Sequence, residues 1–205
     1  PIHLVHNAVV VAEDAPVPLL RAQRRYIAWL GVFRYGKNLP LLFRIAQEFP
    51  NLEFRVAGML DRKVDQSTVD AVNGLRHLPN VEMVGYVRRT DVQKFLSEAT
   101  MLLSTSDFEG FSNVFLEALA VGTPVITRRQ VDPDSIIARH NLGASAEDDL
   151  TLSKSVKAFW DMEANEYGAL AGRCQIYVKA NHSPTVIARR LITALTPLIA
   201  KGKLP

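Results

Sequence analysis

Short apolar runs alternate with segments of helical periodicity through most of the 205 residues of the chain. Nearly continuous apolar runs are typical of strands that are buried on both faces of a parallel sheet. They predict strands at 26–33, 52–58, 81–85, 100–104, 125–127 and, more weakly, 142–146. The pattern therefore predicts an α/β fold, a Rossmann-like parallel sheet of about six strands with helices on both faces.

The segments between these runs have apolar residues at helical spacing. They predict helices at 39–49, 64–77, 90–99 and 112–121, and mainly helix from Leu150 onward. Thr90 is expected to cap the third of these helices, and Ser183-Pro184 to begin the last one. Ligands bind beyond the carboxyl ends of the strands in such sheets, so the candidate site lies in the loops after Phe33, Gly58, Gly85 and Ser104.

The length suits one well-buried domain. We expect an entry segment at 1–25, a ligand-binding domain at 26–182 and a C-terminal helix at 183–205. The chain begins with Pro1 instead of Met, so we expect it to be cut from a longer protein. No apolar run approaches the roughly 20 residues that span a bilayer, and the start does not resemble a signal peptide.

Composition is that of a folded domain, with 48% hydrophobic and 22% charged residues and a net charge of +3. The arginine clusters at 21–25, 88–89, 128–129 and 189–190 lack interleaved aromatic residues, so we expect mostly solvated faces and no nucleic-acid partner. The single cysteine, Cys174, excludes an internal disulfide framework and favours a cytoplasmic location. We expect it to be a small core residue.

Residues 107–126 carry the most informative chemistry. Glu109 lies in a predicted loop and Glu117 lies in the helix that follows, with free backbone amides between them. A helix N-terminus binds phosphate, and two carboxylates at this spacing could accept hydrogen bonds from a sugar and a ribose. The alternative is that Glu109 caps the helix and Glu117 is a surface charge. The residues by themselves leave both interpretations open.

The segment from Glu109 to Ile126 matches the pattern E-G-F-x-N-V-x-L-E-A-x-A-x-G-x-P-V-I nearly position for position. It resembles the signature of the group 1 (family 4) retaining glycosyltransferases, and the chain resembles the nucleotide-sugar-binding half of their GT-B fold. The resemblance implies that Glu109 contacts the donor sugar and Glu117 the nucleotide ribose. It also implies that the amides of residues 111–113, which are Phe111, Ser112 and Asn113, lie near the sugar and phosphates.

A second resemblance lies in the loop after the first predicted strand. The family places an arginine after a glycine, and then a lysine before the first helix, with both on the diphosphate. Lys37 fits the lysine, whereas Val32 occupies the arginine position. Arg34, in the same loop, could replace that guanidinium, because an arginine side chain can bind phosphate in a bidentate manner. The alternative is that Arg34 is a surface residue.

Two weaker matches complete the resemblance. Residues 81–87 resemble a strand and turn beside the nucleotide base, which makes Tyr86, Val87 and Arg88 candidates for base contacts. Gly58 stands where the family has a glycine close to the diphosphate, although a glycine that merely ends a strand is the alternative. His6 lies in a stretch that resembles the family's connection between domains, and we expect it to be an interdomain residue.

The resemblance implies transfer of a sugar from a nucleotide-sugar donor with retention of configuration, with no metal and no cofactor. The acceptor, a sugar, a lipid-linked saccharide or a polysaccharide, would bind an N-terminal domain missing from this chain. The fragment alone is then expected to be inactive. The resemblance also leaves room for peripheral association of the full-length protein with the inner face of the membrane. The alternatives are a non-catalytic sugar-nucleotide-binding module, or a phosphorylase or epimerase on the same fold.

Overall fold

The computed structural model describes residues 6–10 and 20–200, with side chains to Thr196, so much of the predicted entry segment lies outside the described residues. Six strands form one parallel sheet in the order β3-β2-β1-β4-β5-β6. They are β1 (Tyr26–Leu30), β2 (Phe54–Ala57), β3 (Val81–Gly85), β4 (Ala99–Leu103), β5 (Val125–Arg128) and β6 (Gly143–Ala146). The predicted Rossmann-like α/β fold is confirmed.

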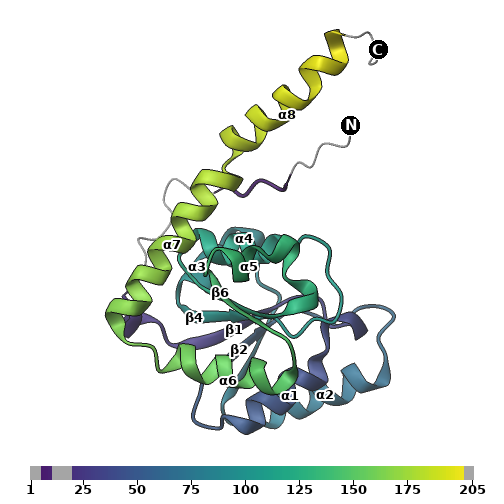
Figure 1. Ribbon diagram of the computed structural model, residues 1–205. Helices are drawn as coiled ribbons and strands as arrows, with labels where there is room; N and C mark the ends of the chain where they lie inside the picture. Colours follow the sequence, from purple (N-terminus) through teal and green to yellow (C-terminus); the bar gives the residue numbers. More distant parts are fainter. Residues whose placement is uncertain (1–5, 11–19, 201–205) are drawn as a thin grey trace.

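Helices connect the strands and extend beyond them. They are α1 (Leu39–Glu48), α2 (Gln66–His77), α3 (Val92–Ser97), α4 (Asn113–Ala120), α5 (Ile136–Arg139), α6 (Asp149–Trp160), α7 (Ala164–His182) and α8 (Pro184–Ala200). The predicted helices after Leu150 correspond to α6, α7 and α8. Figure 1 shows α8 projecting away from the sheet as a continuation of the chain beyond α7.

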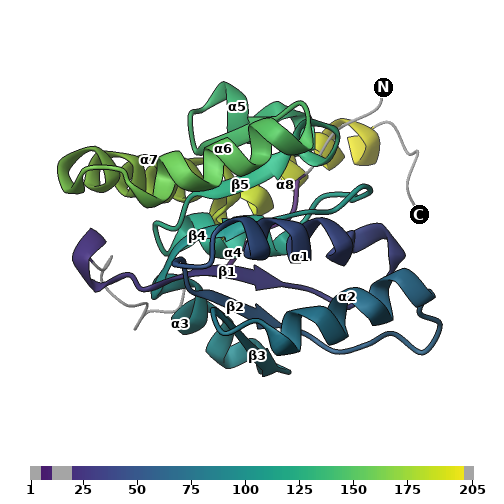
Figure 2. The same cartoon turned by 90° about the horizontal axis from the view of Figure 1, so that it is seen from below.

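Alternation along β1 shows how the sheet is buried on both faces, since successive side chains in a strand point to opposite sides. Tyr26 and Ala28 belong to one core cluster, with apolar residues of α3, α4, α5 and α7. Ile27 and Trp29 belong to the other, with residues of α1, α2 and α6. Figure 2 shows α1 and α2 side by side along their part of the sheet. Every residue from Tyr26 to Trp29 is therefore buried.

Two local predictions need correction. The strand expected at 26–33 ends at Leu30, and Phe33 forms only an isolated bridge with Leu60. The helix expected at 90–99 begins at Val92 after a 3-10 turn, and Thr90 does not cap it. The Thr90 hydroxyl instead donates to Asp91 Oδ1 at 3.2 Å.

Arg24 contradicts the expectation of a solvated arginine cluster at 21–25. Its side chain is buried and donates to Ala99 O at 2.8 Å and to Thr123 Oγ1 at 2.6 Å. It also donates to Val121 O at 3.1 Å and lies over the Tyr167 ring at 5.2 Å from the centroid. The hydrogen bonds compensate for the burial of the charge, so this arginine is part of the core.

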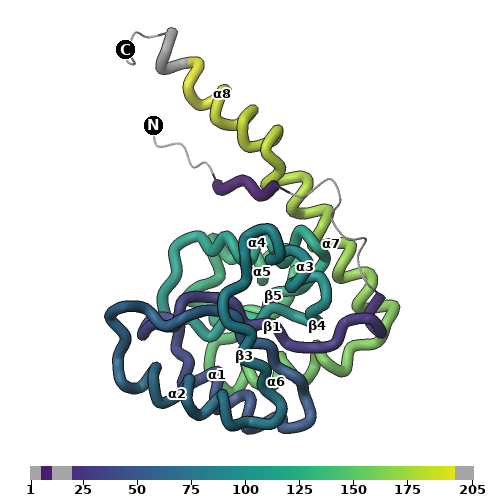
Figure 3. Tube along the Cα trace, turned by 180° about the vertical axis from the view of Figure 1, so that it is seen from behind, coloured from purple at the N-terminus to yellow at the C-terminus, as the bar shows by residue number. Residues whose placement is uncertain are grey.

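Residues 6–10 lie beside the end of α7 (Figure 3). The Val9 amide donates to His182 O at 2.9 Å, and His182 Nδ1 lies 3.0 Å from Asn7 O. Burial lowers the pKa of His182. On the same helix Cys174 is buried as expected, and burial raises the pKa of its thiol to about 12. Neither side chain is thus placed as a solvent-accessible nucleophile.

Candidate functional site

The loop between β1 and α1 carries Lys37. It contains a 3-10 turn over Tyr35–Lys37 and ends at Asn38, which has the left-handed φ of 49°. The Asn38 side chain caps α1 by accepting a hydrogen bond from the Leu41 amide at 3.1 Å. An asparagine tolerates this backbone conformation and caps a helix at the same time. The residue after Lys37 is therefore fixed to the start of a helix.

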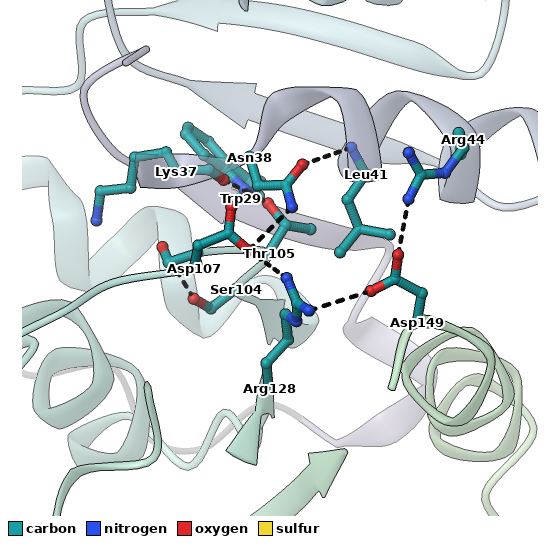
Figure 4. A network of polar contacts seen from close by, with 11 residues as sticks. Trp29, Lys37, Asn38, Leu41, Arg44, Ser104, Thr105, Asp107, Arg128 and Asp149 are labelled. Atoms are coloured by element: carbon teal, nitrogen blue, oxygen red, sulfur yellow. Dashed lines mark hydrogen bonds and ion pairs between the residues drawn. The ribbon is translucent and has the colours of Figure 1, made fainter. Parts of the chain in front are cut away.

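The loop between β4 and α4 lies against the Lys37 loop. The buried Thr105 hydroxyl donates to Lys37 O at 2.8 Å and accepts from Trp29 Nε1 at 3.0 Å (Figure 4). The Asp107 amide donates to Gly36 O at 2.9 Å. The two loops follow adjacent strands, as the sheet order requires, and these contacts fasten their main chains together.

Lys37 and Glu109 form an ion pair across these two loops. Their side chains are only 15% and 12% exposed, so the pair is more strongly coupled than a surface ion pair. Ser106 Oγ donates to the same Glu109 oxygen at 3.1 Å. The structure thus brings together the residue assigned by resemblance to the diphosphate and the residue assigned to the sugar.

A second ion pair involves Asp107, which lies two positions before Glu109 in the chain. The Asp107 carboxylate pairs with Arg128 at the end of β5 and accepts from Asn38 Nδ2 at 3.1 Å. Arg128 also lies 3.6 Å from Asp149, which pairs with Arg44 at 2.7 Å (Figure 4). The Arg128 side chain is 18% exposed, so the expectation of a solvated face at 128–129 is wrong for it. It holds for the exposed Arg129.

Two cavities meet at Glu109. One, of about 780 Å³, is lined by Arg34, Tyr35, Asp107, Phe108, Glu109, Gly110 and Gln130. The other, of about 400 Å³, shares Glu109, Gly110 and Gln130 and extends toward His6 and Asp134. The larger one has the volume of a small-molecule site, and it combines a guanidinium, carboxylates, an amide and exposed aromatic rings. Arg34 is thus placed in the same cavity as Glu109.

The N-terminus of α4 lies next to this region. Ser112 occupies the N-cap position without a side-chain cap, and the first amides of a helix have no partner within it. The Asn113 side chain accepts a hydrogen bond from Asn7 Nδ2 at 2.8 Å, while Phe111 packs near the His6 ring. The predicted amide positions therefore lie at a helix start that can accept an anion.

Glu117 lies farther along α4, in a separate cavity of about 240 Å³. This cavity is also lined by Arg89, Thr90, Gln93 and Asn113, and by residues 8–10 of the N-terminal segment. Burial raises the pKa of Glu117, and the charge of Arg89 opposes the shift. Asn113 connects the two regions, because it stands at the helix start and lines the Glu117 cavity.

The three candidate base contacts lie elsewhere. Tyr86, Val87 and Arg88 line a cavity of about 600 Å³ together with Arg55 and residues of α3. Tyr86 and Arg88 are exposed, and Arg88 Nε pairs with Asp91 at 2.8 Å. The structure therefore does not bring these residues into the cavity of Glu117, where Arg89 and Thr90 stand instead.

Gly58 has a structural reason to be glycine. Its φ is +150°, and a Cβ there would lie 1.9 Å from Gly31 O. Its amide donates to Gly85 O at 2.8 Å. The glycine allows the chain after β2 to approach the loop after β1 closely. This close approach accounts for the glycine by itself, and a place beside the diphosphate stays a prediction.

Sequence reasoning missed Gln130 and Arg89. Gln130 follows β5 and lines both cavities that meet at Glu109, although the loop after the fifth strand was not among the predicted loops. The rule that ligands bind beyond the carboxyl ends of strands applies equally to that loop and would have identified it. Arg89 belongs to the arginine pair at 88–89, for which the sequence predicted a solvated face and no ligand.

Within residues 6–10 and 20–200, no group of three or more histidine, cysteine, aspartate or glutamate side chains is placed to hold a metal ion. In the same part of the chain, none of the helices is both long and apolar enough to cross a bilayer. The site described above consists of ion pairs, helix amides and open cavities.

A Rossmann-like sheet with a polar site at the carboxyl ends of β1 and β4 defines a class of ligand-binding α/β domains. The family model described as glycosyl transferases group 1 matches residues 11–181, and the chain belongs to this family. A search of curated proteins found no match.

Solved structures of glycosyltransferase folds resemble the chain at low sequence identity. A mutant of S. aureus TarM, in a complex with fondaparinux, α-GlcNAc-glycerol and UDP, has a TM-score of 0.73 at 16% identity. The alignment covers 92% of this chain and 38% of TarM. The apo lipopolysaccharide outer core galactosyltransferase WaaB has a TM-score of 0.70 at 18% identity, over 95% of this chain and 55% of that one.

Sucrose-phosphate synthase from Thermosynechococcus elongatus is also similar, with a TM-score of 0.70 at 19% identity. The alignment covers 91% of this chain and 52% of the synthase. The chain thus spans between 38% and 55% of the length of these three proteins. Each of the three proteins contains a region with the same fold as this chain.

Proposed function

We propose that this chain binds the nucleotide-sugar donor of a retaining glycosyltransferase. The observation that carries the proposal is the Lys37–Glu109 ion pair beside the open cavity of about 780 Å³. The two residues are 72 positions apart in the chain and come from different loops. A carboxylate in the wall of a polar cavity, with a cation paired to it, suits a ligand that carries both a diphosphate and sugar hydroxyls.

The roles proposed for the charged groups rest on the resemblance and are supported by their positions. The Lys37 ammonium and the amides at the start of α4 would bind the diphosphate, and Arg34 would add a guanidinium from the cavity wall. Glu109 would accept hydrogen bonds from hydroxyls of the sugar. Charge develops on the diphosphate as the bond to the sugar breaks, and fixed donors stabilise it without reorganisation. We propose that no metal ion or cofactor takes part.

Glu117 would hold the ribose. It is half-buried, lines its own cavity beside Asn113, and lies on the helix whose start would bind phosphate. A carboxylate can accept hydrogen bonds from both hydroxyls of a ribose. Burial favours its neutral form, and a pair of hydroxyl donors would favour the charged form. The base would then lie toward Arg89 and Thr90, which share this cavity.

The acceptor would bind a further domain outside these 205 residues, as a sugar, a lipid-linked saccharide or a polysaccharide. In that arrangement the cavities that meet at Glu109 would face the second domain. The proposal also includes a cytoplasmic location, with the full-length protein able to associate with the inner face of the membrane.

Calorimetric titration of the chain with UDP, GDP and ADP tests the donor-binding role. We expect one of them to bind with a dissociation constant of about 1 mM or tighter, which corresponds to about −4 kcal/mol. We expect no transfer of sugar by the chain alone. Failure of all three nucleotides to bind at that concentration would contradict the proposal.

Retention is tested on the full-length protein. Nuclear magnetic resonance of the first-formed product should show the same anomeric configuration as the donor. Formation of the opposite anomer would contradict the retaining mechanism but not donor binding. Phosphorolysis or epimerisation of the donor without an acceptor would indicate one of the other activities known to this fold.

A further inference from the structure

We propose that Asp107 and Arg128 are positioning residues, which hold the Lys37 loop in place and keep the Asp107 charge compensated beside the bound diphosphate. This inference rests on the proposed function, since it concerns the same ligand. Neither residue is assigned a role by the sequence motifs, which place the chemistry on Glu109, Glu117 and Lys37.

Asp107 lies where three segments meet. Its amide donates to Gly36 O at 2.9 Å, and its carboxylate accepts from Asn38 Nδ2 at 3.1 Å. The same carboxylate oxygen pairs with Arg128, which comes from the end of β5. Figure 4 shows this carboxylate between the start of α1 and the Arg128 guanidinium. Asp107 thus connects the loops after β1 and β4 to the end of β5.

These contacts fix Lys37 from both sides. Its two chain neighbours, Gly36 and Asn38, are each bonded to Asp107, and its own carbonyl accepts from Thr105 at 2.8 Å. The main chain of Lys37 is therefore held by the fold itself, and its side chain is held by the ion pair with Glu109. Ordering a binding group in advance lowers the entropy lost on binding.

Arg128 has a second effect, which is electrostatic. Asp107 lines the cavity of about 780 Å³, whereas Arg128 is not among its lining residues. Arg128 therefore compensates Asp107 from behind the cavity wall. Without that guanidinium, the Asp107 carboxylate would face an incoming diphosphate with its charge uncompensated. Like charges at short distance repel more strongly in a partly buried site than in water.

The contact with Asp149 holds Arg128 in this orientation. Arg128 Nη2 lies 3.6 Å from Asp149 Oδ1, and Asp149 Oδ2 accepts from Arg44 at 2.7 Å. The guanidinium is thus placed between two carboxylates on different elements. Arg129, the next residue, offers a matched control because it pairs with Glu147 at the surface, where the two side chains are 68% and 70% exposed.

The experiment is a titration with the nucleoside diphosphate that binds the unaltered chain, and with its nucleoside, against four variants. Arg128→Gln should weaken the diphosphate about tenfold, because it exposes the ligand to the Asp107 charge. Asp107→Asn should change the affinity by no more than about threefold, because weaker positioning of the loop and the loss of a negative charge beside the ligand act in opposite directions. The double variant should resemble Asp107→Asn alone. Arg129→Gln should leave the affinity within about twofold.

Nucleoside affinity should remain the same in all four variants, because the positioned group is a phosphate ligand. An equal loss of nucleoside and diphosphate affinity in Arg128→Gln would show a merely structural role and overturn the proposal. Diphosphate binding tighter by about tenfold or more in Asp107→Asn would also overturn it, since Arg128 would then be a direct ligand that Asp107 holds away.

Hydrogen exchange on the ligand-free chain separates this proposal from the donor-binding one. Asp107→Ala should speed amide exchange in residues 34–38 by about tenfold or more, with exchange in β2 and α2 unchanged as a control for folding. Faster exchange in a chain that binds none of the three diphosphates would leave the positioning contacts established and the donor-binding proposal refuted. Unchanged exchange at 34–38 would refute the positioning proposal even where diphosphate binds.

Discussion

Glu109 and Glu117 belong to one sequence motif, but they lie in different electrostatic surroundings. Glu109 pairs with Lys37 and accepts a hydrogen bond from Ser106, so the protein itself compensates its charge. Glu117 forms no ion pair with the described residues, and burial raises its pKa although the charge of Arg89 opposes the shift. The charge of Glu109 is compensated within the fold, whereas Glu117 would gain hydrogen-bond donors from a hydroxyl-bearing ligand.

This difference shows what a spacing motif can and cannot convey. Glu117 follows Glu109 by eight positions, so Glu109 lies in a loop and Glu117 lies in the middle of a helix. The residues that surround each glutamate then decide its chemistry. Lys37 and Arg89 come from other loops, so the motif does not contain the charges that distinguish its two glutamates. Variants that change the surroundings of one glutamate and not of the other test whether the two differ in this way.

Lys37→Ala should change ligand affinity more than any other single variant. It should weaken the nucleoside diphosphate about a hundredfold, since a charged hydrogen bond is lost and Glu109 is left unpaired near the phosphates. Nucleoside affinity should change little. Calorimetry with both ligands measures the contrast, and the double variant with Glu109→Gln should recover part of the loss. Equal weakening of both ligands would remove Lys37 from the diphosphate.

Glu117→Gln should weaken the bare nucleotide about tenfold, because it removes the charge from the proposed ribose acceptor. Glu109→Gln should leave the affinity for the same nucleotide within about threefold, since no sugar is present for it to contact. The same calorimetric titration compares the two. Equal losses would return both residues to the interpretation as a helix cap and a surface charge.

A 2′-deoxy nucleotide tests the contact of Glu117 more directly. In the unaltered chain it should bind about fivefold more weakly than the ribonucleotide, because one hydroxyl donor is missing. In Glu117→Gln the penalty should shrink to about twofold. A penalty that stays the same in the variant would place the ribose somewhere other than Glu117.

The smallest effect concerns stability, where the two glutamates should act with opposite sign. The pKa of Glu117 is raised above its ordinary value of 4.5, so the unfolded chain loses this proton first as the pH rises. Stability therefore falls through that window, and Glu117→Gln should remove the loss. We expect its melting temperature to match the unaltered chain at pH 4 and to exceed it by about 1–2 °C at pH 7.

Glu109→Gln should instead lower the melting temperature at pH 7, because Lys37 loses its charged partner. Scanning calorimetry at both pH values checks the pair of variants. The same sign for both at pH 7 would show that their surroundings do not differ in the way described.

Much of the fold could be predicted from the sequence because the strands carry their own signal. Residues 81–85 are a strand as predicted, and α4 lies within one residue of the predicted 112–121 at each end. The first strand was predicted too long because Phe33 is apolar and buried, yet it only bridges Leu60. An apolar, buried residue can belong either to a strand or to a loop that packs against the sheet, so its burial does not show where the strand ends.

The site was less accessible to sequence reasoning, because its ion pairs join distant loops. Arg128 and Asp107 are 21 residues apart, and they meet only because β4 and β5 are neighbours in the sheet. The sequence around Arg128 does not indicate that Asp107 is its partner, and the same holds for the sequence around Asp107. A solvated arginine was therefore the ordinary expectation. The assignments of Glu109, Glu117 and Lys37 to ligand atoms stay predictions, although the structure places the first and third in direct contact.

Arg24 bears on where the chain can be shortened. It precedes the first strand, yet it supplies hydrogen bonds to Ala99 O, Val121 O and Thr123 Oγ1 in the interior. A fragment trimmed to start at Tyr26 would keep every strand and lose the donor that satisfies these three acceptors. Each unsatisfied buried acceptor costs about 1–3 kcal/mol, which is a large share of the stability of a single domain. The edge of the folded unit is thus marked by a side chain that lies two residues before the first strand, which begins at Tyr26.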